Sequence, residues 1–131
     1  MGQNEHLIDQ ADILLKSYNN NDDLAIKIVN IIICFNSICN KLDTEHVRMW
    51  VQNFAKRLIE SSKPESEKKH ARSWHMEKYI LIIELLVTKN VDKIDRQLTN
   101  DLLEIYSIDT THFTKTIWYK LLKIMAHLQY I

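Results

Sequence analysis

The sequence contains almost no glycine or proline. Among 131 residues there is one glycine, Gly2, and one proline, Pro64, where average usage would give roughly nine and roughly six. Sheets, barrels and doubly wound folds need tight turns whose positive-φ positions are usually filled by glycine. Because no glycine follows residue 2, the composition excludes these folds and predicts an all-α protein.

The lack of glycine also excludes several kinds of active site. Phosphate-binding loops, dinucleotide fingerprints and the nucleophile elbow of hydrolases each need glycine where the backbone approaches a ligand or turns sharply. The two cysteines, Cys34 and Cys39, are too few for a zinc site of the paired-cysteine type. We therefore expect no enzymatic activity, no cofactor and no metal ion.

Excess charge and long apolar runs are missing as well. Seventeen lysines and arginines balance seventeen aspartates and glutamates, which argues against binding nucleic acid by bulk charge. Runs such as Ile31–Phe35 are far too short to span a bilayer, and no basic segment followed by an apolar stretch opens the sequence. We expect no membrane partner and a reducing intracellular compartment, the cytoplasm or the nucleus.

Apolar residues recur at helical spacing along most of the chain. The breaks between these runs carry the residue types that cap helices or form turns, including Asn19–Asp22, Asp43 and Asn90, and Ser62 to Glu65 has the spacing of a capping box around Pro64. Six helices are predicted, over residues 4–18, 24–40, 44–60, 65–89, 91–106 and 112–128. Their short connections predict a single compact antiparallel bundle formed by one domain, residues 1–131.

The predicted helix over residues 24–40 is apolar in every direction. Such a helix is expected to have neighbours on most sides, so we predict that it lies at the centre of the bundle. Cys34 and Cys39 fall on it about 140° apart. At that separation they cannot form a disulfide without unwinding the helix.

Charge is unevenly distributed along the sequence. Residues 1–25 contain five acidic residues and one lysine, residues 56–78 contain seven basic and four acidic residues, and residues 110–131 contain three lysines and no acid. Lys68, Arg72 and His75 share one side of the predicted helix 65–89. The pattern predicts a mildly basic face for binding a partner, formed by Lys56, Arg57, Lys68, Lys69, Arg72, Trp74 and His75.

Three functions are compatible with this face. The leading hypothesis is a non-catalytic protein-protein interaction module, an adaptor or regulatory subunit, whose partner carries an acidic segment. The alternative is a nucleic-acid-binding domain that uses the same face, and a weaker third is a helical hydrolase using His70 or His75 with Glu77. Interleaved opposite charges are also typical of an ordinary solvated helix.

The three tryptophans, Trp50, Trp74 and Trp118, each lie in an apolar periodic run. We expect them to pack in the core or to be half-buried, with Trp74 as the best candidate for an exposed anchor because it lies nearest the basic segment. Trp118 and Tyr119 directly precede Lys120, and their alternative role is stacking on a base or on an aromatic side chain of a partner.

Overall fold

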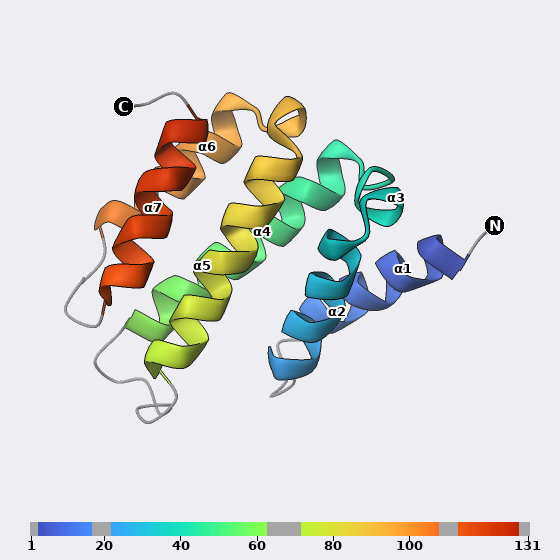
Figure 1. The fold of residues 1–131 in the computed structure, drawn as a ribbon, viewed down its shortest axis with the longest axis horizontal. Helices are drawn as coiled ribbons and strands as arrows, with labels where there is room; N and C mark the ends of the chain where they lie inside the picture. Colours follow the sequence, from blue (N-terminus) through green and yellow to red (C-terminus); the bar gives the residue numbers. More distant parts are fainter. Residues whose placement is uncertain (1–2, 17–21, 63–71, 108–112, 129–131) are drawn as a thin grey trace.

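A computed structural model describes residues 3–16, 22–62, 72–107 and 113–128 (Figure 1). All regular structure within these residues is helical, which confirms the predicted all-α bundle. Two 3-10 helices, η1 (Val91–Lys93) and η2 (Glu104–Ser107), lie on either side of α6. The α-helices are α1 (Gln3–Lys16), α2 (Asp22–Cys34), α3 (Asn36–Cys39), α4 (Thr44–Ser62), α5 (Arg72–Lys89), α6 (Arg96–Leu103) and α7 (Lys115–His127).

Helix α5 lies at the centre of the bundle. It packs against α2, α4 and α7, and Figure 1 shows α7 and α2 on either side of it and α4 behind it. Burying a large aliphatic side chain stabilises a fold by about 1.5–3 kcal/mol. Seven α5 side chains are fully buried, namely Met76, Tyr79, Ile80, Ile82, Ile83, Leu86 and Val87.

The prediction that the helix beginning at residue 24 is central was wrong. Helix α2 packs against α1, α3 and α5, but one side of it remains in solvent. Leu24 and Ile31 on that side are 46% and 49% exposed, and Phe35, directly after the helix, is 57% exposed. Apolar periodicity shows which side chains can be buried, but it does not show how many neighbouring helices are present to bury them.

The predicted helix 24–40 is divided at Phe35 into α2 and α3. The Phe35 amide donates to the Ile31 carbonyl at 3.3 Å, and the Ile38 and Cys39 amides both donate to the Phe35 carbonyl at 2.9 Å. β-Branched residues such as the isoleucines before the break have low helix propensity. The break lets Ile38, Cys39 and Leu42 enter the core. Cys34 is exposed, Cys39 is buried, and both are free thiols.

The segment from Asn90 to Ser107 also differs from the prediction. It forms η1, α6 and η2 where one helix was expected. Asn90 does not cap a helix with its side chain; it is buried, and its amide group donates to the Leu86 carbonyl at 3.0 Å. Asp95 caps α6 instead by accepting from the Leu98 amide at 2.9 Å. This hydrogen bond is the main reason why the pKa of Asp95 is lowered.

Two predicted helix starts have different outcomes. Helix α4 agrees with the predicted span 44–60, and Asp43 caps it as expected by accepting from the His46 amide at 2.8 Å. Helix α5 begins at Arg72, whereas the prediction began at residue 65. Residues 65–71, Pro64 and most of the predicted capping box lie outside the described residues.

Polar contacts hold α1 against α4. Asp12 accepts from the indole N–H of Trp50, and its other oxygen lies 3.1 Å from Nε2 of His46. Three residues further along α1, the Leu15 carbonyl accepts from the side-chain amide of Asn53 at 2.9 Å. Trp50 is 1% exposed, so its predicted place in the core is confirmed.

Replacing Asp43 with alanine is expected to lower the free energy of unfolding by about 1 kcal/mol at neutral pH, because the cap of α4 is lost. The pKa of Asp43 is lowered, chiefly by the hydrogen bond from the His46 amide. A carboxyl whose pKa is lower in the folded state stabilises the fold above its unfolded pKa of about 4, and this contribution disappears as pH falls through the folded pKa.

Urea denaturation at neutral pH and at about pH 3 measures the effect. The difference in stability between Asp43→Ala and the original chain should shrink at the acidic pH. Asp43→Asn is the control, since it keeps a side-chain oxygen that can accept from the His46 amide. An alanine variant as stable as the original chain at neutral pH would contradict the capping role.

Candidate functional site

The predicted basic face is only partly within the described structure. Lys68 and Lys69 lie outside the described residues. Arg72 and Trp74 belong to the first turn of α5, where the backbone is described but the side chains are not. The face as a whole therefore stays a prediction. The three members whose side chains are described are Lys56, Arg57 and His75.

Arg57 is held inside the bundle. It is 8% exposed, its Nε donates to the side-chain oxygen of Asn53 at 2.6 Å, and its Nη2 lies 3.4 Å from the Leu15 carbonyl. The neighbouring Lys56 is exposed. The sequence places two basic residues side by side, but successive residues lie 100° apart around a helix. One of them consequently enters the interface with α1 while the other faces solvent.

His75 connects α5 to α2. Its Nε2 lies 3.2 Å from Oδ1 of Asp23, and its ring stacks on Tyr79 with 6.1 Å between ring centroids. Only 13% of the His75 side chain is exposed, against 67% for Asp23. Tyr79 itself is buried, and this burial raises the pKa of its hydroxyl. His75 thus closes one end of the space between the two helices.

Helices α2 and α5 run in the same direction and are joined at both ends. At their N-terminal ends the contact is His75 with Asp23. At their C-terminal ends, Nζ of Lys89 donates to the Ile33 carbonyl at 2.7 Å. A groove lies between these two contacts, and its volume is about 400 Å³. This volume is within the usual range for ligand pockets, about 300–1,000 Å³.

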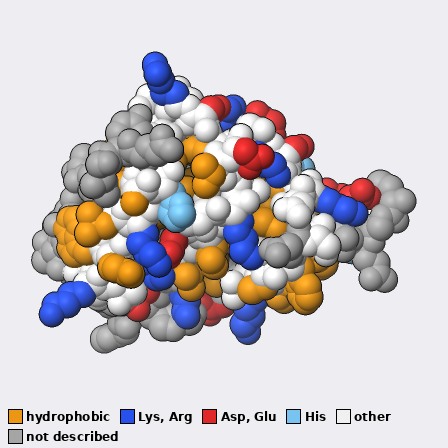
Figure 2. Space-filling model, turned by 45° about the horizontal axis from the view of Figure 1, so that its top comes forward, with side chains coloured by type: hydrophobic (Ala, Val, Ile, Leu, Met, Phe, Trp, Pro, Cys, Tyr) orange, Lys and Arg blue, Asp and Glu red, His pale blue; other side chains and the backbone are white. Residues whose placement is uncertain are grey.

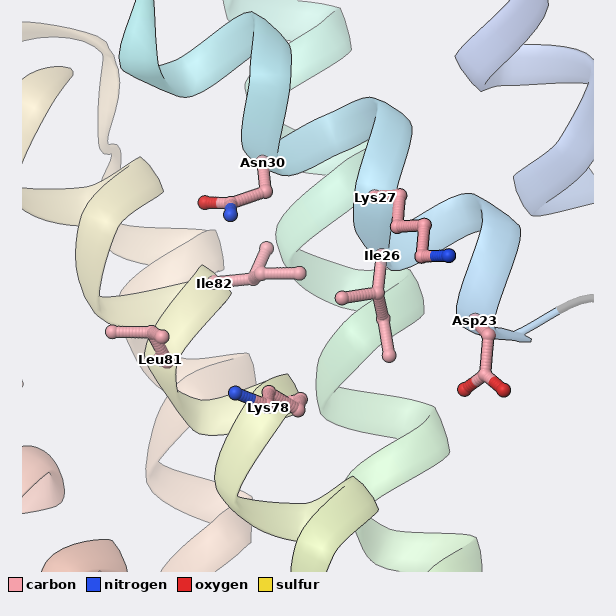
Figure 3. A pocket seen from close by; sticks show the side chains of 7 residues that line it. All are labelled: Asp23, Ile26, Lys27, Asn30, Lys78, Leu81 and Ile82. Carbon is pink, nitrogen blue, oxygen red and sulfur yellow. The ribbon is translucent and has the colours of Figure 1, made fainter.

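The groove has an apolar base and a polar rim. Ile26 and Ile82 are buried, and Figure 3 shows them projecting into the space between α2 and α5. Lys27 is exposed, and within the described structure it has no hydrogen-bond or ion-pair partner. The groove is lined by Asp23, Ile26, Lys27, Asn30, Lys78, Leu81 and Ile82.

The sequence analysis did not identify the α2 side of this groove. Lys27 is the only charged residue in the apolar stretch 24–40, which the sequence predicts to be a central helix with neighbours on most sides. Asp23, Lys27 and Asn30 are spaced i, i+4 and i+7, which puts them on one side of a helix. This polar stripe is the feature of the sequence from which the α2 side of the groove could have been predicted. The α5 side overlaps the predicted basic segment only at Lys78.

The described residues offer few other sites. No group of three histidine, cysteine, aspartate or glutamate side chains in the described ranges is arranged to hold a metal ion. None of the described helices combines the length and the apolar character needed to cross a membrane. Comparison of the chain with protein-family models, with curated proteins and with solved structures found no match.

Arg57→Ala is expected to lower the free energy of unfolding by about 2 kcal/mol, since hydrogen bonds from a buried charged group contribute about 1.5–3 kcal/mol. Lys56→Ala is the matched control on the adjacent exposed position and should change stability by less than about 0.5 kcal/mol. Chemical denaturation followed by circular dichroism measures both variants. Equal effects at the two positions would contradict the internal role of Arg57.

Proposed function

We propose that this chain is a non-catalytic interaction module, an adaptor or regulatory subunit, that binds an acidic amphipathic segment of a partner protein. The segment lies in the groove between α2 and α5. The observation that carries this proposal is the combination of an apolar base at Ile26 and Ile82 with lysines at the rim, Lys27 on α2 and Lys78 on α5. The compartment, expected to be reducing and intracellular, stays a prediction.

The chemistry of the groove supports a helical segment as the partner. Amphipathic helices bind in grooves by inserting apolar side chains spaced three or four residues apart. Carboxylates beside those side chains would lie close to Lys27 and Lys78, where ion pairs favour correct orientation and fast association. We keep the partner with an acidic segment that the sequence predicts. Its proposed binding site is the groove between α2 and α5, which borders the predicted face at residues 56–78.

Nucleic acid is the alternative partner for the same lysines. One observation favours a protein. The base of the groove is formed by isoleucine side chains, which offer neither the aromatic rings nor the hydrogen-bond donors that bind bases.

Three labelled helical peptides test the proposal. They share one pattern of leucines and carry glutamate, glutamine or lysine at the flanking positions. Fluorescence anisotropy should rank their affinities in the order glutamate, glutamine, lysine. The double variant Lys27→Glu, Lys78→Glu should reverse this order, because the rim then attracts lysine. We expect the affinity for the glutamate peptide to fall at least about tenfold in this variant, which corresponds to about 1.4 kcal/mol.

Two further variants test whether the change in peptide affinity depends on the lysines of the groove. Lys41→Glu with Arg96→Glu changes the net charge equally at exposed positions outside the groove, and it should bind the peptides like the original chain. Lys27→Glu alone breaks no hydrogen bond or ion pair within the described structure and should show a smaller loss. Equal affinities for the three peptides would contradict the proposal. Binding of single-stranded nucleic acid that weakens steeply between about 50 and 200 mM salt would favour the alternative.

A further inference from the structure

The two flanks of the bundle carry opposite charge. Helix α7 forms one edge of the molecule and α1 forms the opposite edge (Figure 1). Residues 110–131 contain three lysines and no acidic residue, whereas residues 1–25 contain five acidic residues and one lysine. Although the net charge is zero, acidic residues are therefore concentrated in the first segment and basic residues in the last one.

The α7 flank exposes large apolar side chains between lysines. Trp118, Tyr119 and Leu122 are 39%, 61% and 54% exposed, so of the two expected positions for Trp118, core or half-buried, the structure shows the half-buried one. Lys115 and Lys123 lie at either end of this stretch, eight residues apart, which is about 12 Å along a helix. Nζ of Lys123 also lies 3.4 Å from Oε1 of Glu84 on α5, so this lysine already has an ion-pair partner inside the molecule. At the left of Figure 2, where α7 lies, apolar side chains sit beside basic ones. Tyrosine and tryptophan are enriched at protein interfaces.

The α1 flank is acidic and also has exposed apolar side chains. Glu5, Asp9 and Ile13 follow each other at four-residue spacing and are all exposed, which places them on one stripe of α1. Glu5 and Asp9 make no ion pair within the described structure. The adjacent helix α2 contributes the exposed side chains of Leu24 and Ile31.

We propose that the α7 flank of one molecule binds the α1–α2 flank of a second copy of this chain. Lys115 and Lys123 then lie against Glu5 and Asp9, and the aromatic side chains of α7 cover the apolar side chains of α1 and α2. Both the sign of the charge and the apolar character of the two flanks are complementary. A symmetric pairing of α7 with α7 would instead bring lysines together, and this repulsion disfavours it.

The contact joins two different surfaces, so it does not close by a two-fold axis. Each added molecule leaves one α7 flank and one α1–α2 flank unoccupied, and such contacts extend into a ring or an open chain. A single helix face is a small interface, for which we expect dissociation constants between about 1 µM and 1 mM. The residues argued to make this contact differ from those that line the groove between α2 and α5, although Lys27 of the groove lies beside Leu24 and Ile31 on α2.

Sedimentation equilibrium of the purified chain over a range of concentrations tests the proposal. The average mass should rise above that of the monomer with concentration at about 50 mM salt, and association should weaken at least about tenfold near 500 mM salt, where charges are screened. The paired variant Tyr119→Ala, Leu122→Ala should stay monomeric while its circular dichroism and thermal melt remain those of the original chain. The groove variant Lys78→Glu, whose substitution lies on α5, should associate normally.

Charge reversal with complementation decides which surfaces meet. One variant carries Lys115→Glu and Thr116→Glu in the first turn of α7, where acidic residues suit the helix dipole. The other carries Glu5→Lys and Asp9→Lys. Each should associate poorly alone, and an equal mixture should associate again, since a reversed α7 meets a reversed α1. A chain that stays monomeric at low salt, or variants that associate alone as well as together, would overturn the proposal.

Discussion

Burial of α5 is the constraint on which the rest of this structure depends. Helices α2, α4 and α7 pack around it, and side chains such as Tyr79, Ile83 and Leu86 are fully buried. Because burial of apolar surface is the dominant favourable term in folding, the outer helices are positioned chiefly by the side of α5 that each one covers. The polar contacts between α1 and α4, such as Asn53 with the Leu15 carbonyl, then fix the one long helix that does not depend on α5.

The packing around α5 also explains the positions of the surfaces that we propose for binding. Helix α2 covers one side of α5, and contacts at both ends, His75 with Asp23 and Lys89 with the Ile33 carbonyl, hold the two helices side by side. The space left between these contacts is the groove. The opposite side of α2 has no helix to cover it, so Leu24 and Ile31 remain exposed. The groove and the α1–α2 flank thus both border α2, whereas the α7 flank lies at the opposite edge of the bundle.

The sequence predicted the fold class and most helices because backbone sterics and apolar periodicity are local properties. Asp43 was recognised as a cap for the same reason. The break at Phe35, the central position of α5 and the exposure of Trp118 depend on which helices pack together, and periodicity does not contain that information. The predicted basic face had the same weakness: adjacent Lys56 and Arg57 are equivalent by charge, yet only the packing of α1 on α4 decides that Arg57 is internal. The sequence did not indicate a role for Lys27 in the groove, because apolar residues in every direction predict a central helix with neighbours on most sides.

Native-state amide hydrogen exchange tests the central position of α5 most directly. Amides that exchange only when the whole molecule unfolds report the most stable part of a fold. If α5 organises the bundle, the amides from Ile80 to Leu86 should be among the slowest, with opening free energies equal to that of global unfolding, and those of α1 should exchange through smaller openings. Faster exchange in α5 than in α1 or α2 would contradict this account.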